Sequence, residues 1–138
     1  EVMRTNDNPD YFAAHHLAGA TIADRLDGLG WQWQTRQAGA GPAIDYANPH
    51  GPGRIGIIAP YSKDFCASCN RLRVSATGKL HLCLFGDAGI DLRPLLQWDD
   101  QREALVERLQ RLVATKAPAH LLHQGNSGAT PHLASIGG

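Results

Sequence analysis

The stretch "DFCASCNRLRVSATGKLHLCLFG", residues 64–86, decides the fold of this chain and contains all of its three cysteines. The segments "RLRVS" and "KLHLC" alternate polar and apolar residues on either side of "ATG". This pattern predicts a β-hairpin with a three-residue loop, in which Gly78 adopts a positive φ. The expected register places Ser75 opposite Lys79, Arg73 opposite His81, and Arg71 opposite Cys83.

The predicted hairpin separates its cationic and thiol side chains from its aliphatic ones, because side chains alternate between the two faces of a strand. One face is expected to carry Arg71, Arg73, Lys79, His81 and Cys83, and also Cys69 if the strand extends that far. The other face is expected to join the core and to carry Leu72, Val74, Leu80, Leu82 and Leu84.

Cys66 and Cys69 form a C-x-x-C turn, and the hairpin would bring Cys83 back toward them. Two kinds of metal site fit three grouped thiols. A structural zinc ion needs four ligands, and His81 is a candidate for the fourth, although this spacing is not one of the common zinc patterns. An iron–sulfur cluster held by three cysteines would leave one iron open to substrate. The spacing alone leaves both metals open.

Arg71 and Arg73 lie next to these thiols in the sequence, and guanidinium groups bind phosphate or carboxylate through paired hydrogen bonds. The formal net charge of the chain is zero, which argues against bulk nucleic-acid binding. An anionic ligand would therefore be held by a local cluster of charge. The chain has no apolar run of membrane-spanning length, and grouped thiols in odd number suit metal ligation in the cytoplasm better than a disulfide framework.

The rest of the chain predicts helices and strands at ordinary spacing. A helix is expected within residues 9–29, with Gly30 at its C-terminal end. Strands are expected in residues 31–37, 43–47 and 54–61, and helical segments in residues 90–96 and 99–117. The expected apolar stripes are Ile22, Leu26 and Leu29 in the first helix and Leu105, Leu109 and Leu112 in the last, where Asp99 or Asp100 is the expected cap.

The patterns F-C-x-x-C-N-R-x-R-V, G-K-L-x-x-C-L-F-G and D-L-R-x-L-L resemble the C-terminal signature of the GTP 3′,8-cyclase family. These radical S-adenosylmethionine lyases convert GTP to (8S)-3′,8-cyclo-7,8-dihydroguanosine 5′-triphosphate in molybdenum cofactor biosynthesis. The resemblance covers residues 65–86 and 91–96, "HLLHQG" at 120–125, and the terminal Gly137-Gly138. It implies a 4Fe–4S cluster on Cys66, Cys69 and Cys83 and GTP contacts from Arg71, Leu72 and Arg73, with Leu72 contributing only its backbone. No catalytic residue is assigned.

The resemblance also implies an α/β architecture. Residues 1–29 would be the end of a partial β/α radical S-adenosylmethionine barrel, and residues 30–138 a hairpin-rich segment with helices and an inserted Gly-Gly tail. Met3 matches a methionine that lies against S-adenosylmethionine in the family. No cysteine precedes Cys66, so the C-x-x-x-C-x-x-C motif of the family's first cluster is absent. We expect the C-terminal part of a longer enzyme, inactive alone, whose candidate partners are GTP, the N-terminal barrel of the same enzyme and a second copy in a homodimer.

A second class of protein fits the same residues. In this alternative, zinc stabilises a binding module that grips an anionic partner through Arg71 and Arg73. Further expectations concern three pairs of residues and one single lysine. His15 and His16 are expected to be a loop pair, and His120 and His123 to have surface or core roles. Trp31 and Trp33 are expected to pack on a sheet, and Lys79 to lie either near the site or at a solvated strand end.

Overall fold

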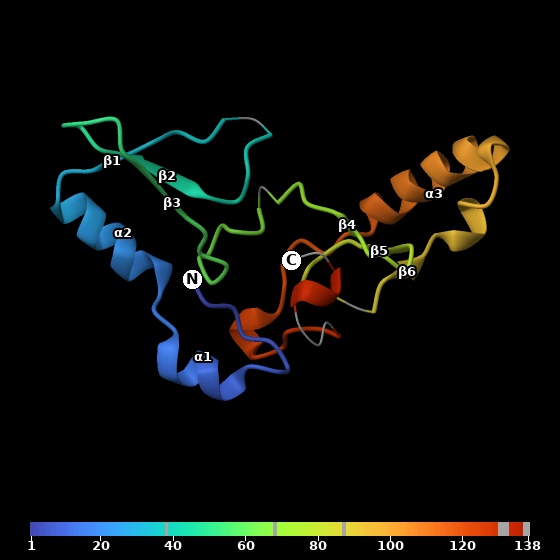
Figure 1. The fold of residues 1–138 in the computed structure, drawn as a ribbon, viewed down its shortest axis with the longest axis horizontal. Coiled ribbons are helices and arrows are strands. Elements are labelled where there is room, and N and C mark those ends of the chain that lie inside the picture. The colour runs from blue at the N-terminus through green and yellow to red at the C-terminus, as the bar shows by residue number, and fades with distance from the viewer. Residues whose placement is uncertain (38, 68, 87, 130–132, 137–138) are drawn as a thin grey trace. The chain divides into compact units, whose positions relative to one another are not determined.

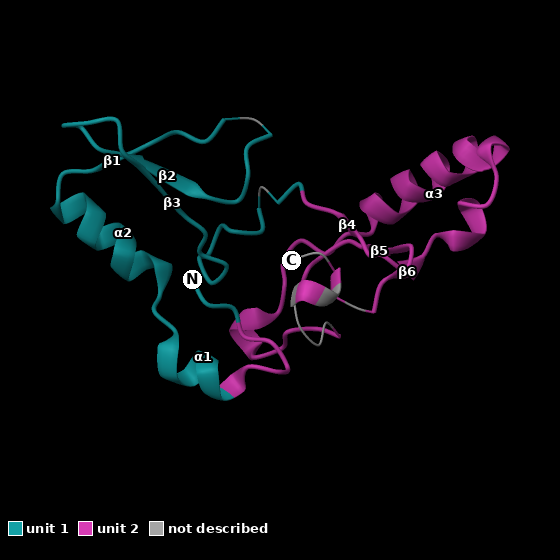
Figure 2. Cartoon of the chain, viewed as in Figure 1, with its two compact units in different colours: residues 1–3, 10–70 teal, residues 4–9, 71–138 magenta. Residues whose placement is uncertain are grey.

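The computed structural model describes residues 1–37, 39–67, 69–86, 88–129 and 133–136 (Figure 1). The fold is mixed α/β, with two small antiparallel sheets. The contacts divide the chain into two compact units (Figure 2). Unit 1 comprises Glu1–Met3 and Asp10–Asn70, and unit 2 comprises Arg4–Pro9 and Arg71–Gly138. The expected division at residue 30 and the barrel origin of the first residues stay predictions, and the Gly137-Gly138 tail lies outside the described residues.

Unit 1 consists of two helices followed by a three-stranded sheet in the order β1-β2-β3. Its elements are α1 (Pro9–His15, of which Pro9 belongs to unit 2), α2 (Gly19–Gly28), β1 (Gln32–Trp33), β2 (Ile44–Ala47) and β3 (Arg54–Ile57). The predicted helix is therefore two helices, and Gly30 follows the second with a φ of 78°. All three predicted strands are present, in shorter form, and pair antiparallel.

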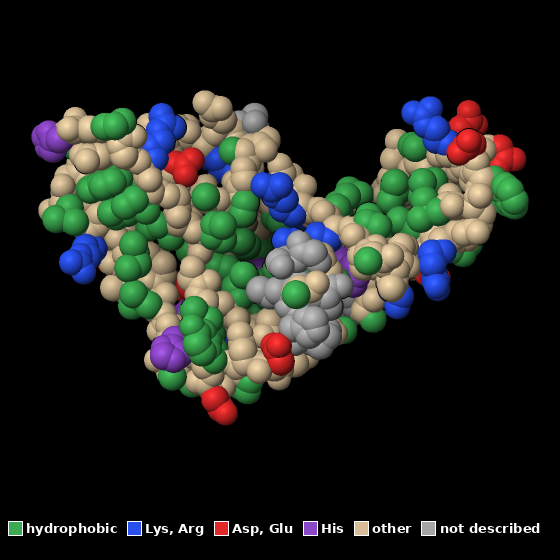
Figure 3. Space-filling view, viewed as in Figure 1, with side chains coloured by type: hydrophobic (Ala, Val, Ile, Leu, Met, Phe, Trp, Pro, Cys, Tyr) green, Lys and Arg blue, Asp and Glu red, His purple; other side chains and the backbone are tan. Residues whose placement is uncertain are grey.

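The core of unit 1 lies between α2 and its sheet, and comprises Leu26, Tyr46, Ile57 and Ala59. A Cβ on Gly19 would lie 2.6 Å from that of Ala59, so the absent side chain permits this close approach. Trp31 packs against the core as predicted, whereas Trp33 is exposed. Figure 3 shows hydrophobic side chains at the surface over the sheet and α2 of this unit.

The stripe predicted on α2 is only partly correct. Leu26 is buried, but Ile22 and Leu29 are 37% and 64% exposed. The sheet is too small to cover the whole apolar side of the helix, since its longest strands have four residues each. Over the described residues, no helix has the length and apolar character that crossing a membrane requires.

Unit 2 contains a second sheet in the order β4-β5-β6, followed by α3. Its elements are β4 (Arg73–Val74), β5 (Lys79–His81), β6 (Ile90–Asp91), η1 (Arg93–Leu95), η2 (Asp99–Gln101), α3 (Arg102–Ala114), η3 (Leu122–Gln124) and η4 (Leu133–Ile136). The buried cluster is Leu80, Leu92 and Leu112, with Leu105 and Leu109 packed against it. This confirms the stripe predicted on the last helix.

Two expectations for unit 2 are wrong. Residues 90–96 do not form one helical segment, because Ile90 pairs with Leu80 in the sheet before the chain turns into η1. Neither Asp99 nor Asp100 caps α3, because both lie inside η2. The Gln101 side chain serves the turn before α3, accepting hydrogen bonds from the backbone N–H groups of Gln97 and Trp98 at 2.9 and 3.1 Å.

Candidate functional site

The predicted hairpin is present in unit 2. Arg73 lies opposite His81, and the Ser75 N–H donates to the Lys79 carbonyl oxygen at 2.9 Å. Gly78 has a φ of 73° at the predicted loop position. These observations confirm the register, although β4 has only two residues. The predicted pair of Arg71 with Cys83 lies outside the strand ladder.

The predicted separation of faces is only partly correct. Leu80 is 2% exposed, but Leu72 and Val74 are 43% and 59% exposed. β4 is a short strand at the edge of the sheet. The core is instead formed by Leu80 of β5, by Leu92, which follows β6, and by Leu112 of α3. Leu72 lies just before β4. It was expected to join the core, but its side chain is exposed.

His81 is more buried than its place on a cationic face suggested, with 7% exposure. Its Nδ1 has no hydrogen-bond partner among the described residues. The ring lies against Gly89, where a Cβ would be 2.7 Å from the ring atoms Cε1 and Nε2. Gly89 has a φ of 84°, so glycine meets both a conformational and a steric requirement here.

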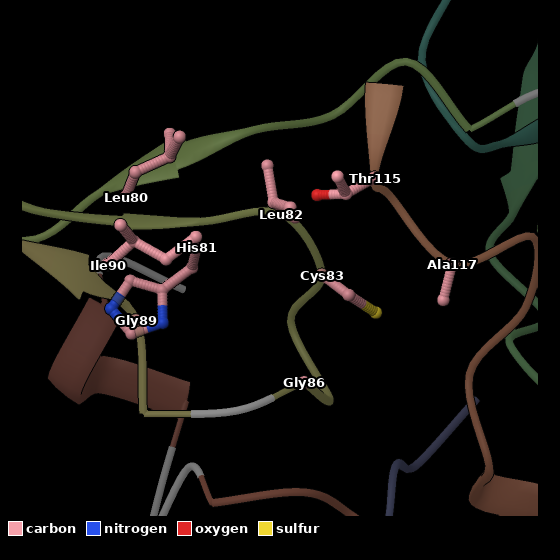
Figure 4. A pocket seen from close by; sticks show the side chains of 9 residues that line it. All are labelled: Leu80, His81, Leu82, Cys83, Gly86, Gly89, Ile90, Thr115 and Ala117. Atoms are coloured by element: carbon pink, nitrogen blue, oxygen red, sulfur yellow. The ribbon is translucent and has the colours of Figure 1, made fainter. Parts of the chain in front are cut away.

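A pocket of about 200 Å³ lies beside the hairpin of unit 2. It is lined by His81, Cys83, Gly86, Gly89, Thr115 and Ala117 together with Leu80, Leu82 and Ile90 (Figure 4). In this view the Cys83 sulfur extends to the side on which Thr115 and Ala117 lie. The segment after α3 therefore shares a cavity with the third cysteine.

The three cysteines are all described and half-buried. Cys66 and Cys69 belong to unit 1, where the Cys69 N–H donates to the Cys66 carbonyl oxygen at 3.1 Å. This bond confirms the predicted turn. Cys83 belongs to unit 2 and follows β5. Over the described residues of either unit, no three His, Cys, Asp or Glu side chains are grouped to hold a metal ion. Convergence of the three sulfurs stays a prediction.

The two arginines of the expected nucleotide site lie in unit 2, at and just before β4. Arg71 is exposed and Arg73 is half-buried. The Lys116 Nζ donates a hydrogen bond to the Arg71 carbonyl oxygen at 2.9 Å. Lys116 was not singled out from the sequence, because only the fold brings together residues so far apart in the chain.

Lys79 lies opposite Asp91, and Asp91 is held by Arg93. The Arg93 Nη2 donates to Asp91 Oδ2 at 2.7 Å, and its Nε donates to Oδ1 at 3.0 Å. These hydrogen bonds lower the pKa of Asp91 to about 2, and the same pairing raises the pKa of Arg93. Lys79 is half-buried within the sheet, so its surroundings are those of a structural strand residue.

The remaining predicted residues have ordinary surroundings. Met3 is half-buried in unit 1. His15 is the last residue of α1, so the expectation of a loop pair is wrong for this residue, whereas His16 follows the helix and pairs with Glu1 at 2.9 Å. His120 is buried, accepts the Leu122 N–H on Nδ1 at 3.3 Å and meets Phe85 edge-on at 5.5 Å, which confirms a core role. His123 is exposed and stacks with His120.

Residues 1–122 match the family model described as Molybdenum Cofactor Synthesis C, and the chain belongs to this family. It is 57% identical over 138 residues to a protein of Vibrio cholerae serotype O1 named GTP 3′,8-cyclase. Proteins of the same name from Stenotrophomonas maltophilia and Vibrio parahaemolyticus are 55% and 54% identical. The predicted resemblance to the C-terminal part of these enzymes is confirmed.

The matches cover 100% of this chain and 41%, 42% and 41% of these three relatives, respectively. The chain thus spans about two fifths of their length. No solved structure matches the chain.

Proposed function

We propose that this chain is the C-terminal part of a GTP 3′,8-cyclase and supplies its second cluster and its GTP-binding residues. The observation that carries the proposal is the 57% identity to an enzyme of that name across all 138 residues. The whole enzyme would convert GTP to (8S)-3′,8-cyclo-7,8-dihydroguanosine 5′-triphosphate by radical S-adenosylmethionine chemistry.

In this proposal Cys66, Cys69 and Cys83 hold the 4Fe–4S cluster. The donor set fits, because thiolates are the usual cluster ligands and all three thiols are half-buried, neither sealed in a core nor fully solvated. The hydrogen bond from the Cys69 N–H to the Cys66 carbonyl oxygen supports a turn that would bring two of these thiols toward one cluster. When bound, the cluster would supply one iron with an open coordination position for a substrate atom.

Arg71 and Arg73 would bind the triphosphate of GTP. Arg73 is anchored in the hairpin by its pairing with His81, which limits the freedom of the backbone that carries its guanidinium. Leu72 would still contribute only its backbone, since its exposed side chain has no charge or hydrogen-bonding group to offer a nucleotide. Met3 would lie against S-adenosylmethionine.

The remaining partner in this proposal is the N-terminal barrel, which would hold the first cluster. Because no cysteine precedes Cys66, the 138-residue chain would not cleave S-adenosylmethionine by itself. The zinc-stabilised module is the competing proposal, and metal analysis separates the two.

Calorimetric titration of the anaerobically reconstituted chain with GTP tests the nucleotide site. Arg73→Ala should weaken binding by about 1.5–3 kcal/mol, the scale of a hydrogen bond to a charged group. Arg73→Lys should recover only part of this loss, because the paired donors are missing. Arg111→Ala is the matched control, since Arg111 is an exposed arginine whose pair with Glu107 is as long as 3.8 Å. Parental affinity in Arg73→Ala would contradict the phosphate role.

A further inference from the structure

Lys116 is a cation that the fold places at the arginine segment, although it lies far from that segment in sequence. Its Nζ donates to the carbonyl oxygen of Arg71 at 2.9 Å, across 45 residues. The bond joins the segment after α3 to the residues that lead into β4, and Figure 1 shows the C-terminal end of α3 close to β4. The ammonium group is therefore held at the backbone of the segment that carries both arginines of the proposed nucleotide site.

The backbone around Lys116 is itself anchored. The Lys116 N–H donates to the Val113 carbonyl oxygen at 3.1 Å, which closes the last turn of α3. The Thr115 hydroxyl donates to the Leu112 carbonyl oxygen at 2.7 Å. Leu112 belongs to the core, so the position from which the lysine side chain extends is set by packing.

The charges around this segment favour an anion. Arg71 and Arg73 belong to the segment at and just before β4, and Lys116 is bonded to its backbone, within a chain whose net charge is zero. Asp91, an acidic residue of the same unit, is engaged elsewhere, since it pairs with Arg93 at 2.7 Å. An ammonium group carries three donors and binds phosphate as a point charge.

We propose that Lys116 is a further phosphate-binding residue of the nucleotide site, acting beside Arg71 and Arg73. This inference rests on the proposed function and deepens it, because it assigns a third cation to the triphosphate. The hydrogen bond to the Arg71 carbonyl oxygen holds the ammonium at the backbone just before β4, where its charge would add to those of the two arginines on a bound phosphate.

A purely structural role is the alternative, because a lysine just past a helix C-terminus also interacts favourably with the helix dipole. Such a role would affect stability and would be indifferent to the number of phosphates on a ligand. The Lys116→Gln variant separates the two roles. The glutamine amide keeps a hydrogen-bond donor on a side chain one bond shorter, but it has no charge for a phosphate.

The experiment titrates GTP, GDP and GMP into the reconstituted chain and into its Lys116→Gln, Lys116→Met and Lys116→Arg variants. Lys116→Gln should bind GTP about tenfold more weakly and GMP nearly as well as the parent, the scale of one charge-assisted hydrogen bond. Lys116→Met should show the same dependence on phosphate number, and Lys116→Arg should retain most of the affinity. Lys63→Met, at an exposed lysine of unit 1, is the control and should leave binding unchanged.

Parental GTP affinity in Lys116→Gln, or an equal loss for all three nucleotides, would overturn the inference. If Arg73→Ala still weakens GTP binding in that case, the proposed function stands and only Lys116 loses its role. If the parent chain binds none of the nucleotides, the proposed function and this inference fail together. Thermal melting of each variant identifies one that does not fold, and the remaining lysine variants then decide the outcome.

Discussion

The backbone N–H of Ala129 donates to the carbonyl oxygen of Gly86 at 2.9 Å, so the C-terminal segment lies on the loop that follows Cys83. Gly128 makes this contact close enough that a Cβ would lie 2.6 Å from the Phe85 carbonyl carbon. Its φ is 73°, a conformation that side chains rarely adopt. The loop that carries the third predicted cluster ligand is thus covered by a segment more than forty residues away.

Gly128→Ala should destabilise the chain by about 1–3 kcal/mol, the cost of one strained backbone position, and the contact with Phe85 adds to it. Chemical denaturation measures the free energy of unfolding. Gly28→Ala is the matched control, because the last residue of α2 has open space around a new Cβ and should be neutral or slightly stabilised. An unchanged midpoint in Gly128→Ala would show that this segment does not pack on the loop.

The Asp91–Arg93 pair predicts a specific acid dependence of stability. The pKa of Asp91 is about 2 in the folded chain, below its ordinary value of 3.8. A lowered pKa means that the pair contributes stability above about pH 4, and that this contribution is lost as the pH falls toward 2. The melting temperature of Asp91→Asn should therefore lie below that of the parent at neutral pH, and the difference should disappear between about pH 4 and pH 2.

Asp100→Asn, at an exposed aspartate of η2, controls for the loss of one surface charge. If the parent and Asp91→Asn differ by the same amount at pH 2.5 and pH 7, the lowered pKa of Asp91 is not what stabilises β6.

We expect that the 138-residue chain does not cleave S-adenosylmethionine by itself. The sequence leaves no cysteine outside the three of residues 64–86 to hold a second cluster that could deliver an electron. The reconstituted chain, incubated with S-adenosylmethionine and dithionite, should form no 5′-deoxyadenosine above a protein-free control in a chromatographic assay. Formation of 5′-deoxyadenosine would contradict the proposal that the cluster that cleaves S-adenosylmethionine belongs to another part of the enzyme.

The hairpin could be predicted because its signals are local. Alternation fixes which side chains share a face, and Gly78 fixes the loop, so Arg73 was placed opposite His81 correctly. The exposure of Val74 could not be predicted, because it depends on β4 being an edge strand of the sheet. The burial of His81 likewise depends on Gly89, which lies just before β6 and packs against the His81 ring.

For residues 90–96, in contrast, the local signal led to a wrong prediction. Their sequence has helical spacing, but Ile90 finds a partner in Leu80, and tertiary pairing outweighs local preference in so short a segment. Lys116 was missed for a related reason, since only the packing of Leu112 places it next to Arg71. In both cases the deciding contact is distant in sequence.

The proposed cluster is tested most directly by the metal content and visible spectrum of the anaerobically reconstituted chain, compared with its Cys66→Ser, Cys69→Ser and Cys83→Ser variants. The parent should be brown and contain iron and sulfide in equal amounts, and each substitution should lower both sharply and destabilise the hairpin, because metal binding contributes folding free energy. A colourless chain that retains zinc, or a Cys83→Ser variant with full iron content, would contradict a cluster held by these three cysteines.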